Sequence, residues 1–282
     1  MQTFRKSPFN YIGGKYKLLP QLLPLFPKDA ETFVDLFAGG LDIAINYDAK
    51  QKRCNDINHP LIGVFQAMKA QTIDEVLLHI ETTIEKFQLS KTNKEGYLAL
   101  RTWYNKYRNP LDLYVLICFS FNHQIRFNNH LEFNNPFGKD RSSFSNVMRA
   151  NLIAFHKQLA SIEFSAEDFR CYNFDTLSAA DFVYADPPYL ITCGTYNDGK
   201  RGFKGWNESD DFTLYAQLDN LNNRGIRFAL SNVVEHKGIR NEALKNWMQR
   251  YNVHHIKTDY ANSNYHTAKT EQKTQEVLIT NY

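Results

Sequence analysis

Cysteine is scarce in this chain, and its spacing excludes the common uses of that residue. The four cysteines, at positions 54, 118, 171 and 193, form no CxxC pair and have no accompanying row of histidines. A structural zinc site, or any other metal site, is therefore not expected. We expect reduced, mostly buried thiols, as in a protein of a reducing compartment such as the cytoplasm.

Long apolar runs and a strong excess of one charge are also missing. The most apolar stretch, residues 113–121, is far too short to span a bilayer, and the first ten residues lack the apolar segment of a signal peptide. We therefore expect a soluble protein with no membrane partner. The net charge is only +3 over 282 residues, so a surface for nucleic acid would need local clusters of basic residues.

Alternating strand and helix patterns run through both ends of the chain. Short apolar segments at residues 32–37, 182–185 and 227–231 are typical of buried parallel strands, and helical patterns follow at 212–223 and 241–250. The order predicts a doubly wound α/β sheet. Two further segments, 253–259 and 275–280, flank a polar loop and predict a closing antiparallel hairpin at one edge.

The middle of the chain has a different pattern, because strand and helix signals do not alternate there. It contains four helical patterns, at residues 60–70, 73–87, 97–107 and 111–119. We interpret residues 60–159 as a helical insertion between two parts of the α/β domain, residues 1–59 and 160–282. Alternating polarity around Asn128-Asn129 predicts a β-hairpin over residues 122–138 within the insertion.

The most informative motif is Asp186-Pro187-Pro188-Tyr189, directly after the apolar run 182–185. Proline has no backbone N–H, so the two prolines stiffen the turn and leave carbonyl groups available. A carboxylate, a carbonyl oxygen and an aromatic face then converge at the carboxyl end of a strand. That set suits a planar ring with an exocyclic amine and indicates methylation of an amino nitrogen on a base. The alternative is a Pro-Pro turn in which Asp186 only caps the following segment.

Two glycine turns point to a nucleotide-like ligand. Residues 35–40, DLFAGG, close one predicted strand and open a helix, where glycine lets the backbone approach a ligand. Asp56 ends the next strand and is placed to accept hydrogen bonds from ribose hydroxyls, although an ordinary tight turn is an alternative reading of the glycines. Residues 9–15, FNYIGGK, lack the phosphate-binding pattern, which counts against ATP. Lys15 could supply a charge to a ligand carboxylate, and the alternative is a surface lysine after a flexible turn.

Taken in order, these motifs resemble the Dam-type DNA adenine-N6 methyltransferases, particularly the phage-like members. The resemblance covers FNYIGGK, DLFAGG, NDIN, SFNHQIRFNNHLEFNNPFG and ADPPY, and so nearly the whole chain. It implies a Rossmann-like sheet that uses S-adenosylmethionine. It also implies a set of cofactor-binding residues, which are Tyr11, Lys15, Asp35, Phe37, Gly39, Asp56, Phe174 and Asp186.

The same resemblance makes the hairpin the element that recognises double-stranded DNA. Phe121 would wedge into the base stack beside the extruded base, and Asn122 would help to fill the vacancy. Arg126 would read a guanine edge in the major groove, a contact worth about 1–3 kcal/mol of discrimination. Some relatives read an outer guanine with a lysine where this chain has Asn10. The remaining contacts would come from Gln124 and Pro136 to base edges and from Asn128, Asn134 and Lys139 to phosphates.

Several of these residues could have a role other than contact with DNA. Phe121 ends an apolar helix and could be a core aromatic, and Arg126 could be a solvated charge. Further basic residues available for phosphates could equally form an ordinary solvated face: Arg101, Lys106, Arg108, Arg141 and Arg149.

A mechanism follows from the amine chemistry. Asp186 and the Pro187 carbonyl would accept the two N6 hydrogens and localise the nitrogen lone pair, and Tyr189 would stack on a flipped adenine. The hairpin favours GATC as the recognition sequence, and a restriction endonuclease is a possible functional partner. The alternatives are a cytosine-N4 or RNA adenine methyltransferase, and a DNA-binding protein that senses the cofactor without catalysis. Cytosine-N4 enzymes more often carry serine where Asp186 stands.

Overall fold

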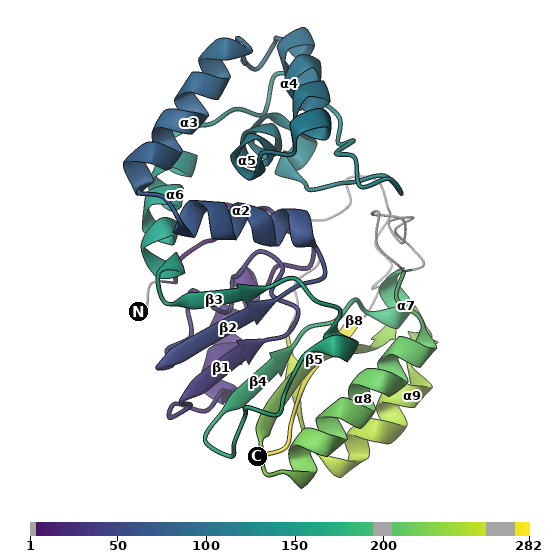
Figure 1. Ribbon diagram of the computed structural model, residues 1–282. Helices are drawn as coiled ribbons and strands as arrows, with labels where there is room; N and C mark the ends of the chain where they lie inside the picture. Colours follow the sequence, from purple (N-terminus) through teal and green to yellow (C-terminus); the bar gives the residue numbers. More distant parts are fainter. Residues whose placement is uncertain (1–3, 194–204, 258–273) are drawn as a thin grey trace.

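A mostly parallel sheet forms one half of the molecule and a helical layer forms the other (Figure 1). The computed structural model describes residues 4–193, 205–257 and 274–282. The strands lie in the order β3-β2-β1-β4-β5-β8-β7, with β6 paired to β5. Their bounds are β1 Thr32–Asp35, β2 Gln51–Asn55, β3 Ile162–Ser165, β4 Phe182–Ala185, β5 Arg227–His236, β6 Ile239–Arg240, β7 Asn252–Ile256 and β8 Thr274–Thr280.

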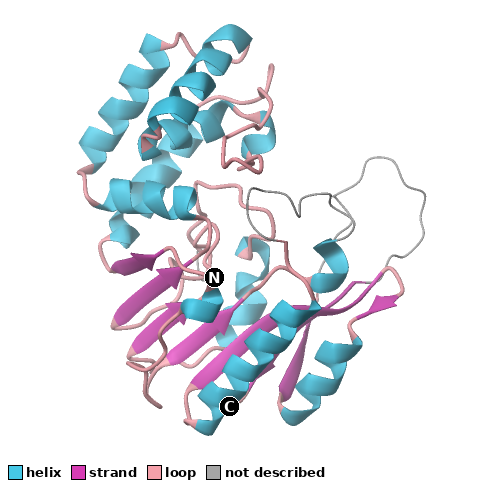
Figure 2. Cartoon of the chain, turned by 45° about the vertical axis from the view of Figure 1, so that its right-hand side comes forward, coloured by secondary structure: helices cyan, strands magenta, loops and turns pink. Residues whose placement is uncertain are grey.

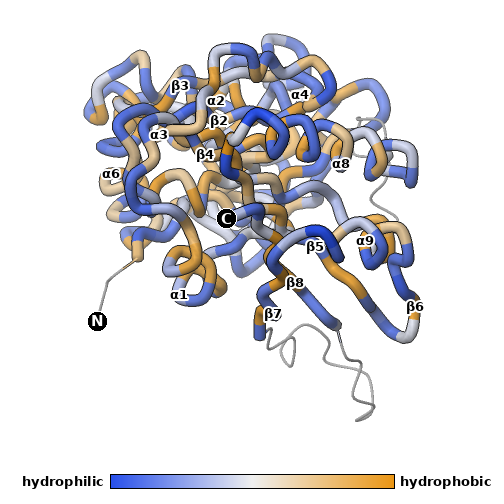
Figure 3. Tube along the Cα trace, turned by 90° about the horizontal axis from the view of Figure 1, so that it is seen from below, coloured by the Kyte–Doolittle hydropathy of each residue, from blue (hydrophilic) through white to orange (hydrophobic). Residues whose placement is uncertain are grey.

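Strands β1 to β5 are parallel. At one edge β8 runs antiparallel between β5 and β7, and β7 therefore has the same direction as β1 to β5. The predicted α/β class is therefore confirmed. Figure 3 shows β5, β8 and β7 side by side at this edge, as the pairing requires. The predicted strand 253–259 corresponds to β7 as far as Ile256, and residues 258 and 259 lie outside the described residues.

The central strands are apolar on both faces because both faces are covered. Phe33 and Phe182 point into one core cluster, while their neighbours Val34 and Val183 point into the other. Alternate side chains of a strand leave opposite faces, so both members of each consecutive pair are buried. The strand β3 has a mixed pattern in which only Ile162 is fully buried, and the sequence analysis did not identify it.

Helices cover each face of the sheet (Figures 1 and 2). On one face lie α8 (Glu208–Asn223) and α9 (Glu242–Trp247), which η5 (Met248–Arg250) extends. The other face packs against the first turns of the chain, η1 (Tyr16–Leu18), α1 (Leu19–Leu22) and η2 (Leu23–Leu25), and against α2 (His59–Lys69) and α6 (Asn146–Leu159). Two short elements, η4 (Phe169–Cys171) and α7 (Leu190–Cys193), lie in the connections around β4.

Between β2 and β3 the chain forms the helical layer, which comprises α2, α3 (Ile73–Lys86), α4 (Lys94–Tyr107), α5 (Pro110–Phe119), η3 (Phe121–His123) and α6. The helix α5 lies at its centre, and every residue from 111 to 119 is buried. Its one buried charge, Asp112, is paired with His79 of α3 at 2.8 Å. A helix that is apolar all round has to be enclosed by other elements, and α2, α3 and α4 enclose this one.

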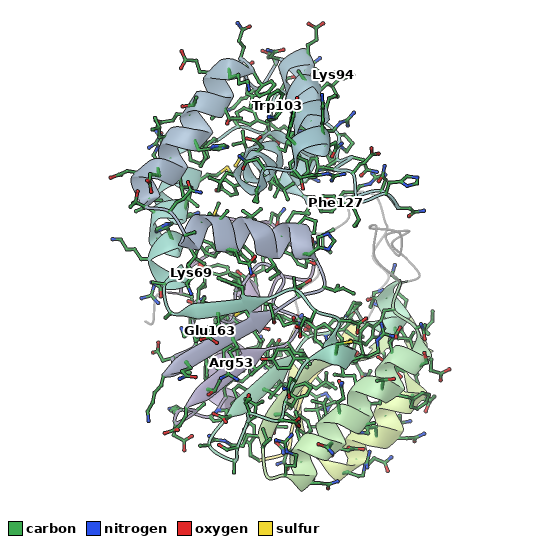
Figure 4. All side chains as sticks on the ribbon, in the orientation of Figure 1. Arg53, Lys69, Lys94, Trp103, Phe127 and Glu163 are labelled. Carbon is green, nitrogen blue, oxygen red and sulfur yellow. The ribbon has the colours of Figure 1, made fainter. Side chains whose placement is uncertain are left out.

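The helical layer is joined to the sheet at β3. Lys69 at the end of α2 donates a hydrogen bond of 2.7 Å to the carbonyl of Ile162. On the sheet, Arg53 of β2 pairs with Glu163 of β3 across neighbouring strands, at 3.5 Å. Figure 4 labels Lys69, Arg53 and Glu163 along this junction. No helix of the described residues has both the length and the apolar character needed to cross a membrane.

The predicted hairpin is present as a bent loop without a regular ladder. Two isolated antiparallel bridges, Ser120–Phe137 and Phe127–Phe133, hold its two arms together. Ile125, Phe127 and Phe133 point into the helical core and are buried, whereas Arg126 between them is exposed. The predicted alternation therefore holds, but the arms are held mainly by side chains of the helical layer.

Candidate active site

A cavity of about 660 Å³ opens where the chain leaves the carboxyl ends of β1, β2 and β4. This is the edge at which open α/β sheets bind ligands. Nearly all residues predicted for the cofactor and the reaction line it: Tyr11, Lys15, Asp35, Phe37, Gly39, Asp56, Asp186, Pro187, Pro188 and Tyr189. The lining residues run from Tyr11 to Asp210, so distant parts of the chain meet in one site.

Asp186 is held at the end of β4 by two donors. The Nζ atom of Lys15 lies 3.0 Å from its Oδ1, and the hydroxyl of Tyr189 donates to the same oxygen at 2.9 Å. Lys15 also donates to the Tyr189 hydroxyl at 2.6 Å. Both of these partners contact Oδ1.

A second carboxylate belongs to this group. Glu276 of β8 lies with Oε1 3.4 Å from Lys15 Nζ and 3.1 Å from the Tyr189 hydroxyl. The sequence analysis did not identify Glu276, because it lies 90 positions beyond Asp186 on a strand that reaches the site only through antiparallel pairing with β5.

Burial and charge act together on these groups. Burial is the largest influence on Asp186 and raises its pKa, Lys15 opposes this, and Glu276 adds to it, so the pKa lies above the ordinary value. For Lys15, burial lowers the pKa, but the two carboxylates outweigh it and the pKa is raised. Lys15 therefore stays a cation between two acidic side chains.

The glycine turn is closed by Asp56. Its Oδ2 accepts from the backbone N–H of Gly39 and its Oδ1 from that of Asn58, both at 2.8 Å. Gly39 has a φ of +46°, and a Cβ there would lie 2.9 Å from the ring of Tyr11. Only glycine therefore lets the turn and the Tyr11 ring come together at this wall of the cavity.

Asp35 carries a buried oxygen that no group of the described residues satisfies. Its side chain is 2% exposed, and Oδ1 has no hydrogen-bond partner among the described residues. Burial first, and then the charge of Asp186 and other nearby acids, raises its pKa well above the ordinary value. An acidic group left in this state is suited to a ligand that donates a hydrogen bond or carries positive charge.

Three aromatic rings form another wall of the cavity. Phe37, Phe169 and Trp206 lie with ring centroids 5.2–5.7 Å apart. Phe174, which was predicted to pack on the cofactor adenine, does not line the cavity and instead lies against Tyr172 at 5.0 Å. The short helix η4 turns the chain so that Phe169 points to the site in its place, and no motif in the sequence marks that turn.

The hairpin is fixed by two amide side chains, the half-buried Asn105 of α4 and the buried Asn135 of the hairpin itself, and by Tyr97 of α4. Asn105 of α4 pairs with both the N–H and the carbonyl of Phe133, at 2.8 and 3.0 Å. The side chain of Asn135 donates to the carbonyls of Phe121 and Gln124, and Tyr97 donates to the carbonyl of Asn135. The sequence analysis did not single out these three supporting residues, since amides and tyrosines have many uses.

Several residues predicted to contact DNA are accessible on this scaffold. Phe121 is 43% exposed and is therefore not a core aromatic. Arg126, Pro136 and Lys139 are exposed, and Gln124 is half-buried. Asn122 adopts a left-handed backbone conformation at φ 53°, and its carbonyl accepts from Asn10 at 2.8 Å. This last bond ties the start of the hairpin to the segment that carries Tyr11 and Lys15.

Two predicted phosphate contacts have other surroundings. Asn128 closes the hairpin turn, since its Oδ1 accepts from the N–H groups of His130 and Glu132 and its amide donates to Glu132. Its side chain is therefore engaged within the protein. Asn134 is half-buried, and its Oδ1 has no partner among the described residues.

The other basic candidates differ in how they are held. Arg149 pairs with Glu81, and Arg108 donates to the carbonyl of Leu131, so both have partners within the protein. Lys106 and Arg141 are exposed, and Arg101 is half-buried.

Comparison with known proteins identifies the family. A family model described as D12 class N6 adenine-specific DNA methyltransferase matches residues 11–262. The chain belongs to this family. The match includes the glycine turns, the helical layer and the Asp186 motif, and it agrees with the resemblance noted from the sequence.

Individual relatives fall into two groups. The chain is 50% identical to the type II methyltransferase M.FokI of Planomicrobium okeanokoites, over 99% of this chain and 43% of that protein. It is 51% identical to the modification methylase StsI of Streptococcus sanguinis, over 100% of this chain and 43% of that protein. The DNA adenine methylase of Escherichia coli K12 is 28% identical, over 95% of this chain and 92% of that protein. The chain thus spans less than half the length of the first two relatives.

The structure also describes three of the cysteine thiols and the arrangement of potential metal ligands. Cys54 and Cys118 are buried free thiols and Cys171 is an exposed one. Within the described residues, no group of three or more His, Cys, Asp or Glu side chains is arranged to hold a metal ion.

Proposed function

We propose that this chain transfers a methyl group from S-adenosylmethionine to the N6 atom of adenine in double-stranded DNA. The observation that carries the proposal is the placement of Asp186. Its carboxylate stands at the carboxyl end of β4, oriented through Oδ1 by Lys15 and Tyr189 and lining a cavity large enough for a cofactor and a base edge. Membership of the D12 family supports the same chemistry.

The residues around the cavity fit S-adenosylmethionine. Asp35 offers an unsatisfied buried carboxylate oxygen to a cationic or hydrogen-donating group. The Gly39 turn gives close backbone approach, Asp56 lies beside it for ribose hydroxyls, and the Phe37 and Phe169 rings provide flat apolar surface for an adenine. When bound, S-adenosylmethionine would supply the methyl group on a positively charged sulfur.

The protein's part in the reaction is to prepare the amine. The lone pair of adenine N6 is delocalised into the ring, so the nitrogen is a poor nucleophile. Asp186 and the Pro187 carbonyl accept the two N6 hydrogens, which draws the nitrogen toward tetrahedral geometry and localises its lone pair. Positioning and electrostatics then provide most of the rate enhancement, and the proton leaves N6 after the transfer.

Access to N6 requires the adenine to leave the duplex. The exposed ring of Phe121 is placed to enter the base stack, and Tyr189 lies in the cavity where a flipped base would stack. The hydrogen bond from Asn10 to Asn122 ties the hairpin to the segment that carries Tyr11 and Lys15, so the element proposed to recognise DNA is linked to the proposed reaction site. Lys139 and neighbouring exposed basic residues would contact phosphates, which makes binding sensitive to salt.

The recognition sequence GATC stays a prediction that rests on the resemblance of the hairpin. The greater identity to M.FokI and StsI makes the sequences that these two proteins modify the first alternatives to test. Their names as a type II methyltransferase and a modification methylase also favour a restriction endonuclease as the functional partner of this chain.

Product analysis tests the proposal. Unmethylated plasmid DNA is incubated with the protein and labelled S-adenosylmethionine, digested to nucleosides and separated. We expect N6-methyladenine from the wild type, none from Asp186→Ala, and full yield from Glu242→Ala, which removes an exposed carboxylate. N4-methylcytosine in place of N6-methyladenine, or no transfer to DNA by folded wild type, would overturn it. Sequencing of modified bases in the same DNA reads out the recognition sequence.

A further inference from the structure

Glu276 is a buried acid in the site for which the proposed reaction has no use. It is 2% exposed, and it lies on β8 in register with Val233 of β5. Leaving a carboxylate charged in such a place is costly unless it is paired. Its contacts include the two residues that hold Asp186, namely Lys15 and Tyr189.

The charges of Lys15, Asp186 and Glu276 indicate what Glu276 does in the site. One ammonium, that of Lys15, stands between two carboxylates, 3.0 Å from Asp186 and 3.4 Å from Glu276. With Asp186 as its only acidic partner, Lys15 would form a neutral pair with it and weaken it as a hydrogen-bond acceptor. With Glu276 included, the three side chains of Lys15, Asp186 and Glu276 comprise two carboxylates and one ammonium group. Lys15 can then orient Asp186 without cancelling its charge.

We propose that Glu276 is a positioning residue that shares the Lys15 ammonium with Asp186 and so keeps the Asp186 carboxylate a strong acceptor for the target amine. The inference rests on the proposed function, because it assigns Glu276 a task in that reaction. Tyr189 strengthens the link, since its single hydroxyl hydrogen can serve either Asp186 or Glu276. The two acids are thereby coupled through both a cation and a hydroxyl.

Replacing Glu276 should shift the pH dependence of the reaction in one direction, through the pKa of Asp186. Burial raises the pKa of Asp186, Lys15 lowers it and Glu276 raises it. Replacing Glu276 with a neutral residue removes one raising influence, so the pKa of Asp186 falls. If ionised Asp186 is needed, the rate declines on the acid side as pH falls through this pKa. The acid limb therefore moves to lower pH in Glu276→Gln. The titratable groups that face Glu276 and Asp186 are Lys15, Asp35, Tyr184 and Tyr189.

The test compares pH–rate profiles of single-turnover methyl transfer for wild type, Glu276→Gln and Glu276→Asp. We expect Glu276→Gln to lower the plateau rate about 10- to 100-fold, as loss of an orienting partner does, and to shift the acid limb to lower pH. Glu276→Asp retains the charge, so its acid limb should stay at the wild-type pH with a smaller loss of rate. Thr280→Val, a buried polar change on the same strand, should leave both unchanged.

The outcomes separate the two proposals. A wild type that transfers no methyl group overturns the proposed function itself. An active wild type with an unshifted acid limb in Glu276→Gln, or with the same shift in Glu276→Asp, overturns the role of Glu276. Thermal melting checks that each variant folds. Should Glu276→Gln fail to fold, Glu276→Asp decides alone: a reduced rate with an unmoved acid limb supports the role, and a wild-type rate refutes it.

Discussion

The cavity at the sheet edge and the hairpin of the helical layer differ in which side chains are buried and which are exposed. In the cavity, charged side chains are buried and hold one another, as Lys15 does with Asp186 and Glu276. In the hairpin, apolar side chains and amides are buried, whereas Arg126 and Lys139 are exposed. Polar side chains at the cavity thus hold one another, whereas the hairpin residues proposed to contact DNA, Phe121, Arg126 and Lys139, are exposed; we call these three the reading surface.

This difference predicts that the hairpin depends on its buried aromatics for stability. Phe133→Ala removes a ring that is 1% exposed and lies 5.8 Å from the ring of Phe127, so we expect a loss of about 3–5 kcal/mol in the free energy of unfolding. Figure 4 labels Phe127, the partner of this ring contact. Urea unfolding followed by circular dichroism measures the loss.

Phe121→Ala is the matched control on the same hairpin. Its ring is 43% exposed, so we expect little change in stability but a marked loss of methyl transfer, because the wedge for base flipping is gone. Equal destabilisation by the two substitutions would contradict the division between scaffold and reading surface.

The cavity should respond to a change of charge without a loss of fold. Asp186→Asn keeps the shape of the side chain but removes the anionic acceptor, and we expect kcat to fall about 10²- to 10³-fold. Affinity for DNA, measured by fluorescence anisotropy, should stay near that of the wild type, because the hairpin is unaltered. A wild-type kcat in this variant would refute the role given to Asp186.

The reading surface should alter specificity rather than rate. For Arg126→Ala we expect discrimination against sequences with a substituted guanine to fall by about 1–3 kcal/mol, with thermal stability unchanged. Lys139→Ala should weaken binding to all sequences alike and reduce the slope of log affinity against log salt by about 1. Competition binding at several salt concentrations distinguishes the two, and a uniform loss for Arg126→Ala would place Arg126 among the phosphate contacts.

The smallest effect that we predict is that of Gly238→Ala, between β5 and β6, which serves as the control for Gly39→Ala in the glycine turn. Gly238→Ala introduces a left-handed alanine at φ +79° with nothing within 4 Å, so its cost should be the backbone strain alone, about 1–2 kcal/mol. Gly39→Ala adds to this strain a contact of 2.9 Å with Tyr11, so its loss of stability should be larger. It should also weaken S-adenosylmethionine binding in calorimetry, which Gly238→Ala should leave intact. Equal effects of the two would remove the argument for close packing at the cavity wall.

Much of the fold could be predicted from local patterns, and the exceptions have physical reasons. The apolar runs of β1 and β4 and the periodicity of α2 to α5 mark their elements because burial on one or both faces imposes those patterns. The edge strand β3 is only partly buried and has no such pattern. Phe174 was predicted at the cavity and Phe169 was not, because a short 3₁₀ turn, which leaves little trace in a sequence, places Phe169 there.

The amino-acid sequence by itself determined the parts of the site that are continuous in the chain. These are the rigid Asp186 turn after a strand, the glycine turn after another, and the lysine after Gly13-Gly14. Only the tertiary structure decided that Glu276 would stand beside Lys15 and Asp186. Its position depends on β8 entering the sheet antiparallel, between β5 and β7, and strand pairing over such a distance in the chain is set by the packing of the whole sheet.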